Sequence, residues 1–91
     1  MRFGEALDAL CVGQRVARAH WSTADVWIFL VPGSTFTVAD DRPMGKANPD
    51  LVGHDVSYRS HIDVHNADGS VEPWIATSTD LLAADWYEVP A

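Results

Sequence analysis

The chain has few of the features that would place it outside the cytoplasm or in a membrane. Cys11 is the single cysteine, so no internal disulfide can form, and no basic segment followed by an apolar segment opens the chain as a signal peptide would. The longest apolar stretch, roughly residues 26–31, is far shorter than the ~20 residues of a membrane-spanning helix. We therefore expect a cytoplasmic protein with no membrane partner.

Positive charge is also scarce. Six Lys and Arg residues stand against 13 Asp and Glu residues, which gives a formal net charge of −7. The electrostatic field of this negative charge repels nucleic-acid backbones and anionic membrane surfaces at long range, so we expect no DNA or RNA partner. A small anionic ligand could be held only where a few of the six cations gather in one pocket.

The motifs that mark common enzyme sites are absent as well. The sequence has no glycine-rich phosphate loop, no G-x-S-x-G nucleophile elbow and no H-E-x-x-H helix. Cys11 falls on the apolar side of a predicted helix, where a lone cysteine is usually a core residue. Since no nucleophile with a base and an orienting partner can be assembled, we expect no enzymatic activity and no cofactor.

What the chain does contain is enough apolar surface to fold. Hydrophobic residues make up 47% of the 91 residues, and four of them are tryptophans, which argues against disorder. We expect residues 1–91 to form a single domain. A domain this small buries a smaller fraction of its surface than a larger one, so self-association would help to stabilise it.

The first half of the chain predicts a helix and then strands. Gly13 would end a helix with an apolar stripe at steps of three and four residues, made up of Phe3, Ala6, Leu7, Leu10 and Cys11. Alternation over residues 16–20 predicts a short strand, and "STAD" predicts a turn. "VWIFLV" is typical of a strand covered on both faces and is bounded by Pro32 and Gly33. We expect "TFTVA", residues 35–39, to be its hairpin partner.

The second half predicts a long loop, a hairpin and a short helix. Residues 40–55 hold two prolines and two glycines without a sustained period, which is typical of a functional loop. "NADGS" suits the turn of a hairpin, and Thr77 and Asp80 have capping-box spacing ahead of an apolar turn. "WYEVP" would form the last strand. The fold class is therefore α+β: an N-terminal helix packed on a mainly antiparallel β-sheet, with a short C-terminal helical turn.

Polar residues alternate along the first strand of the predicted hairpin. Its apolar face would carry Tyr58, Ser60, Ile62 and Val64, and the other face Arg59, His61, Asp63 and His65. The His and Asp side chains have the types that bind zinc or iron, but neighbours on one strand point in parallel rather than converge, so a solvated face is the preferred interpretation and no metal is predicted. Arg59 could bind a phosphate bidentately or form a cross-strand ion pair with Glu72.

The four tryptophans fall into two pairs. Trp27 and Trp86 are predicted to be core residues. Trp21 and Trp74 each stand where a strand meets a hydroxyl-rich turn, and there an indole can offer one face to a flat base while its other side packs. We treat this second pair as candidate ligand contacts.

Several blocks in order resemble one known family. "FGEALDAL", "GQRVARAHW", "FLVPGSTFTV", "YRSHIDV" and "ADGSVEPWIATSTDLLAADW" together are similar to the phage anti-Thoeris sponge family, the second type of Thoeris anti-defence protein, formerly catalogued as a small domain of unknown function. The resemblance spans Phe3 to about Val89. "STADVW" and residues 40–54 depart from the family pattern, which leaves the choice of ligand open.

The resemblance implies a non-enzymatic role in the cytoplasm of the infected bacterium. Members bind a cyclic ADP-ribose isomer made by a TIR-domain enzyme without cleaving it, some relatives also capture cyclic oligonucleotides of CBASS, and they assemble as homotetramers with pockets between subunits. Carried over, the ligand-binding positions are Trp21, Arg59, His61, Asp63, Trp74, Thr79 and Asp80. The alternatives are a module that binds a host protein through residues 40–55, or a metal-dependent hydrolase using His61, Asp63 and His65.

Overall fold

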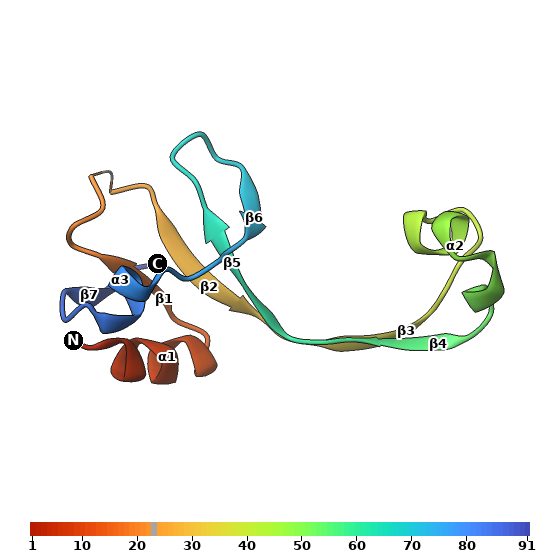
Figure 1. The fold of residues 1–91 in the computed structure, drawn as a ribbon, viewed down its shortest axis with the longest axis horizontal. Coiled ribbons are helices and arrows are strands. Elements are labelled where there is room, and N and C mark those ends of the chain that lie inside the picture. Colours follow the sequence, from red (N-terminus) through yellow and green to blue (C-terminus); the bar gives the residue numbers. More distant parts are fainter. Residues whose placement is uncertain (23) are drawn as a thin grey trace.

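The computed structural model describes residues 1–22 and 24–91 and consists of a body and a long arm (Figure 1). Thr23, in the predicted "STAD" turn, lies outside the described residues. The elements of the body are α1 (Phe3–Cys11), β1 (Arg15–Arg18), β2 (Trp27–Val31), β5 (His61–His65), β6 (Val71–Pro73), α3 (Ser78–Leu82) and β7 (Trp86–Val89). Those of the arm are β3 (Ser34–Thr37), α2 (Pro43–Ala47), the 3-10 helix η1 (Pro49–Leu51) and β4 (Asp55–Tyr58).

The body is a five-stranded antiparallel sheet with α1 on one face, so the predicted α+β fold class is confirmed. The strand order is β6-β5-β2-β1-β7. Register places Val16 opposite Ile28, and Ile28 opposite Val64, on the face toward α1. The buried core consists of Ala6, Ala9, Leu10, Val16, Ile28 and Trp86. Among the described helices, none is long and apolar enough to cross a membrane.

The N-terminal helix ends where the sequence predicts. Gly13 has a φ of +90°, and its N–H donates to the Leu10 carbonyl at 3.0 Å, which closes the last turn in a conformation that glycine adopts easily. The predicted apolar stripe is only partly correct. Leu7 is 40% exposed and Cys11 is also exposed, because the helix turns Ala6, Ala9 and Leu10 toward the sheet.

The prediction that β2 is covered on both faces is wrong for the single chain. Ile28 is its one fully buried residue, because both body helices lie on the side of the core. The second face of the sheet has no helix against it in the described part of the chain (Figure 1). We call it the open face; by register its residues are Arg15, Ala17, Trp27, Phe29, Val31, His61, Asp63, His65, Val71, Pro73, Tyr87 and Val89.

The arm corrects the predicted pairing of residues 35–39. β3 pairs with β4 rather than with β2, whose partners are β1 and β5. The Pro32–Gly33 pair therefore does not form a hairpin turn, and the chain runs on from the body into the arm (Figure 1). A Cβ at Gly33 would lie 2.7 Å from the Tyr58 carbonyl oxygen, so the absence of a side chain lets the two chains pass closely at the base of the arm.

The segment 40–55 is not the structureless loop that its composition predicts. It contains α2 and η1 and folds back on the end of the ribbon, where Val38 is 3% exposed. The Val38 N–H donates to His54, and the Val38 carbonyl accepts from Gly53, both at 3.0 Å. The arm tip thus has a small core of its own.

The predicted hairpin turn is confirmed, although its first strand is shorter than expected. β5 pairs with β6, and Gly69 in the connecting turn has a φ of +87°. Tyr58 belongs to β4, and Arg59 lies between β4 and β5. The alternation predicts Arg59 on the same strand as His61, Asp63 and His65. This prediction is wrong, because Arg59 precedes β5.

The same glycine substitution should have opposite effects in α1 and α2. Alanine at Gly45 would clash with the Ala39 carbonyl, so we expect Gly45→Ala to lower the free energy of unfolding by roughly 1–3 kcal/mol. Nothing lies within 4 Å of a Cβ at Gly4, and alanine loses less conformational entropy than glycine in a helix. Gly4→Ala should therefore raise the free energy of unfolding by roughly 0.5–1 kcal/mol. Urea denaturation measures both, and equal effects would contradict the packing described for the arm tip.

Candidate functional site

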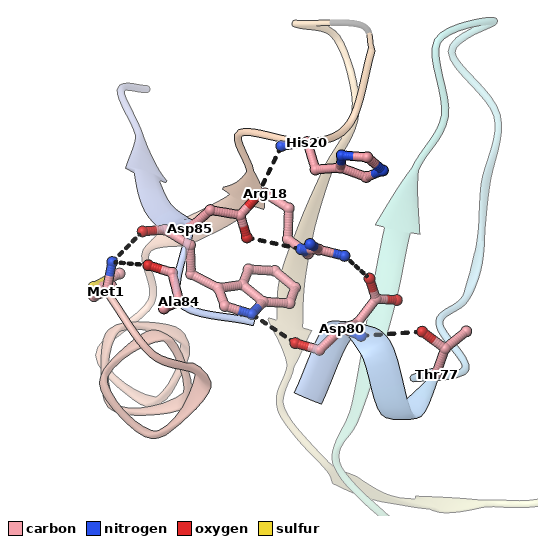
Figure 2. A network of polar contacts seen from close by, with 8 residues as sticks. Met1, Arg18, His20, Thr77, Asp80, Ala84 and Asp85 are labelled. Carbon is pink, nitrogen blue, oxygen red and sulfur yellow. Dashed lines mark hydrogen bonds and ion pairs between the residues drawn. The ribbon is translucent and has the colours of Figure 1, made fainter. Parts of the chain in front are cut away.

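A buried arginine joins the sheet to the C-terminal segment (Figure 2). Arg18, at the end of β1, is 9% exposed. Its Nε donates to Asp85 Oδ1 at 2.9 Å, and its Nη1 donates to Asp80 Oδ1 at 2.7 Å. The second Asp85 oxygen accepts from the His20 N–H at 2.9 Å. Among the described residues, no buried side-chain oxygen or nitrogen of Arg18, Asp80 or Asp85 lacks a hydrogen-bond partner.

Local structure holds the two carboxylates in place. Thr77 caps α3, since its hydroxyl accepts from the Asp80 N–H at 3.1 Å, as the capping-box spacing predicts. The Asp80 carboxylate pairs with Arg18. The Trp86 indole N–H donates to the Asp80 carbonyl at 2.8 Å, and the Met1 nitrogen donates to the Trp86 carbonyl at 2.7 Å.

The bridge shifts the pKa of its members in opposite directions. Burial would raise the pKa of Asp80, but the hydrogen bonds from Arg18 and Thr77 outweigh it and hold that pKa below its ordinary value. The hydrogen bond from Arg18 lowers the pKa of Asp85. Bonds to Asp85 and Asp80 raise the pKa of Arg18. All three groups are therefore charged at neutral pH.

Aromatic rings surround Trp86 at the edge of the core. Trp86 is 1% exposed, so its predicted core position is confirmed. Trp21 and Trp74 meet it edge to face, with ring centroids 5.4 and 6.0 Å away, and Phe3 meets it at 5.2 Å. Both outer indoles are half-buried, so each packs against the core on one side and keeps part of its surface accessible.

The core prediction for Trp27 is wrong. Trp27 lies half-buried on the open face, where its ring stacks on His65 with centroids 4.0 Å apart and planes 3° apart. The Arg15 guanidinium lies 4.2 Å from the centroid of the same ring. These contacts follow from neighbouring strands, because Trp27 stands opposite His65 in the β2–β5 register. A continuous apolar run does not reveal which of its faces a single chain leaves uncovered.

The structure divides the seven predicted ligand-binding residues between two faces. Trp21, Trp74, Thr79 and Asp80 lie near α3 on the core side of the sheet. His61 and Asp63 lie on the open face, and Arg59 is exposed at the base of the arm. One chain therefore does not bring all seven residues into one pocket.

The polar row on β5 does not form the metal site considered as an alternative. His61 Nε2 lies 3.3 Å from Asp63 Oδ1, whereas the His65 ring stacks on Trp27 and places Nδ1 2.9 Å from the Asp25 carbonyl. Across the described residues, no group of three or more His, Cys, Asp or Glu side chains is arranged to hold a metal ion. The cross-strand ion pair of Arg59 with Glu72, also considered from the sequence, is not among the ion pairs of the described residues.

Two surface hollows lie away from the predicted residues. One, of about 460 Å³, is lined by residues 13–15 and 88–91. The other, of about 560 Å³, lies at the arm tip and is lined by residues 36–39 and 41–44. Sequence reasoning missed both hollows, and it also missed the Arg18 bridge. The sequence held one signal for the bridge: in the alternation over residues 16–20, Arg18 falls on the same face as the apolar Val16.

Comparisons with known proteins agree on one family. Residues 1–89 match the Thoeris anti-defense 2-like domain. The chain is also 33% identical over 86 residues to Thoeris anti-defense 2 of Bacillus phage SP01, an alignment that covers 94% of this chain and 91% of that protein. Nearly every element described above lies within both matches.

Acid should weaken the Arg18 bridge. Because the pKa of Asp85 and that of Asp80 are lower in the folded state, the bridge stabilises the fold above the unfolded carboxyl pKa of ~3.9 and loses this effect as the pH falls through the folded pKa. We expect the melting temperature to drop below about pH 5, and less steeply in Asp85→Asn. Asp8→Asn, an exposed change in α1, serves as control. Equal acid sensitivity of Asp85→Asn and the unmodified protein would contradict the bridge.

Proposed function

We propose, because the chain belongs to the Thoeris anti-defense 2-like family, that it is a phage protein that blocks Thoeris defence by sequestering the signal. It would bind a cyclic ADP-ribose-type nucleotide, hold it without cleaving it, and so keep the effector inactive in the cytoplasm of the infected bacterium. The observation that carries this proposal is the match over residues 1–89.

The half-buried indoles suit the base of such a ligand. Trp21 and Trp74 are each supported from behind by Trp86, so their orientation is fixed before a ligand arrives. Stacking of a base on an aromatic side chain contributes ~1–3 kcal/mol and requires no net positive charge. Thr79 is exposed in the first turn of α3 and can hydrogen-bond a ribose hydroxyl. Asp80 is paired with Arg18, so in this proposal it positions α3.

The separation of the predicted residues favours a site shared between copies. His61 and Asp63 face away from the α3 side, and Arg59 is exposed at the base of the arm. A chain of 91 residues buries only a modest fraction of its surface, so a second copy would help to enclose a dinucleotide. A homotetramer would bring the α3 side of one chain near the arm base of another, where Arg59 could bind the pyrophosphate bidentately. The same assembly could also hold cyclic oligonucleotide signals of CBASS.

A sequestering protein must bind tightly because it acts by mass action. Nanomolar affinity corresponds to about −12 kcal/mol, which requires a preformed and well-enclosed site. The Arg18 bridge and the ring cluster around Trp86 supply rigidity on one side of the proposed site. A second chain would supply the enclosure.

The arm favours a second candidate function, direct binding of a host protein. Its tip projects away from the body (Figure 1) and carries the hollow of about 560 Å³, which is bordered by Phe36, Val38 and Met44. Such a surface could receive an apolar side chain of another protein. This candidate requires no nucleotide, which separates it from the first.

An intact signal should be recoverable from the protein. We expect native mass spectrometry of the protein mixed with cyclic ADP-ribose isomers to show a bound nucleotide of unchanged mass, and heating to release it unaltered. A hydrolysed product would contradict the proposal and indicate an enzyme. Calorimetry with the same isomers should show binding heat, whereas no heat with any of them would favour the host-protein candidate.

Trp74 should matter more for the ligand than for the fold. Because Trp74 is only half-buried, we expect Trp74→Ala to weaken nucleotide affinity by roughly 5- to 100-fold, the loss of one stacking contact. Leu82→Ala is the matched control, since Leu82 lies in the neighbouring α3 and is 76% exposed. Calorimetry and thermal melting are compared for both variants. A large loss of stability with unchanged affinity would make Trp74 a purely structural residue.

A further inference from the structure

The arm is built on a ribbon whose outer edges are not paired with another strand of the described chain. β3 and β4 form a two-stranded sheet of their own, and all four residues of β3 are exposed. In Figure 1 the ribbon runs out from the body, and no other described element follows it on either side. An unpaired strand edge is a template on which another chain can pair. The edges of this ribbon are therefore candidate interaction sites.

The bonding pattern shows which backbone groups of β3 point outward. The Val38 N–H donates to the His54 carbonyl across the ribbon, so in the alternation of an antiparallel ladder Phe36 also bonds toward β4. Thr35 and Thr37 then turn their N–H and carbonyl groups away from β4. The hydrogen bonds that the structure describes outside the ladder include none to these groups. The edge of β3 thus offers two donors and two acceptors.

Side-chain bonds support this assignment and distinguish the two edges. The hydroxyls of Thr35 and Ser57 lie 3.1 Å apart, and the Thr37 hydroxyl donates to Asp55 at 2.7 Å. Such close side chains are typical of the pairs whose backbone groups point outward. Native proteins commonly block an exposed edge with charged residues or proline. β4 begins at the charged Asp55, whereas β3 contains neither kind of residue, so its edge is the less protected one.

The hollow at the arm tip lies on the same side of the ribbon. Its lining residues come from 36–39 and 41–44 and none comes from β4, so it opens beside the edge of β3. Phe36 and Val38 border it, and the period of two along a strand puts both side chains on one face of the ribbon. A chain that pairs with β3 would therefore carry the side chains of one of its faces over the hollow.

We propose that the β3 edge and this hollow together bind an extended segment of another protein, which adds a third strand to the ribbon and places one large apolar side chain in the hollow. Backbone bonds at Thr35 and Thr37 supply affinity, and the hollow supplies specificity. Side chains directly opposite each other share a face. The segment therefore alternates hydroxyl residues, opposite the two threonines, with apolar residues, opposite Phe36 and Val38. The net charge of −7 favours a segment with basic ends.

A second copy of this chain fits the site poorly. In a two-fold antiparallel pairing through the outward threonines of both copies, Ser34 and Gly33 of one copy lie opposite Val38 and Ala39 of the other. Serine and glycine are too small to fill a hollow of about 560 Å³. Two copies with a net charge of −7 also repel each other. The size of the hollow and the charge of the chain both favour a segment of different sequence.

This inference rests on the second candidate function, in which the arm binds a host protein, and it names the chemistry of the segment that is bound. It is independent of nucleotide binding, because Trp21 and Trp74 lie in the body. Calorimetry with the cyclic ADP-ribose isomers should accordingly give the same result with and without a bound segment.

A synthetic peptide tests the site directly. The probe acetyl-KLTLTK-amide carries the expected alternation, and we expect saturable binding with a Kd below about 1 mM and slower hydrogen exchange at the Thr35 and Thr37 amides. The control acetyl-KLPLPK-amide lacks the N–H groups that would pair with β3 and should bind at least about tenfold more weakly. The peptide acetyl-KGTLTK-amide, which lacks the side chain placed opposite Val38, should also lose about tenfold.

Proline variants of the chain form a matched pair. Thr37→Pro removes an outward donor from β3 and should weaken peptide binding by about tenfold. Ser57→Pro makes the same change at an outward position of β4 and should leave the affinity unchanged. Circular dichroism establishes that both variants fold. If Thr37→Pro does not fold, the proline peptide makes the same test on the unmodified chain.

Several results would overturn the inference: no binding at about 1 mM peptide, equal binding of the threonine and proline peptides, or equal loss in Ser57→Pro. An oligomer of the chain that dissociates as the peptide binds would overturn it too, since the edge would then belong to a second copy. The second candidate function fails separately. A host protein that binds the chain without displacing the peptide overturns this inference alone, whereas peptide binding in a chain that binds no host protein contradicts that function alone.

Discussion

The Arg18 bridge to Asp80 and Asp85 is the interaction on which the body depends. It joins β1 to α3 and to the residue that precedes β7, and the Trp86 indole adds a bond to the Asp80 carbonyl. A buried cation without partners would be severely destabilising, whereas one matched by two carboxylates is tolerated and fixes geometry. The position of α3 follows from this bridge, and with it the positions of Trp86 and of the indoles that flank it.

A one-sided sheet is the second constraint. α1 and α3 cover a single face, so β2, although apolar throughout, is fully buried only at Ile28. The other face carries Trp27 and Phe29, both half-buried, and Asp63, whose Oδ1 is buried without a hydrogen bond. Of the predicted ligand-binding residues, Trp21 and Trp74 lie on the covered face of this sheet, and His61 and Asp63 lie on the other face.

Much of the body could be predicted from local patterns. Helical spacing and Gly13 defined α1, Thr77 defined the start of α3, and "NADGS" defined the β5–β6 turn, because each depends on residues close in sequence. Features that depend on residues far apart in the sequence could not be predicted in this way. "TFTVA" pairs with β4 rather than with β2, and the close passage at Gly33 that accompanies this pairing is a long-range contact that periodicity does not encode. Likewise, the partners of Arg18 lie more than 60 residues away, and the face on which Trp27 lies depends on strand register. The seven site positions came from the family resemblance and stay predictions.

The small core of the arm tip has a consequence for how such proteins can change over generations. Val38, Gly45 and the backbone bonds to residues 53 and 54 hold the tip together without help from the body. Substitutions in the tip therefore change the stability of the tip alone, and the contacts of the sheet and the Arg18 bridge stay the same. The tip and the body could therefore diverge at different rates, because a substitution in one leaves the contacts of the other unchanged.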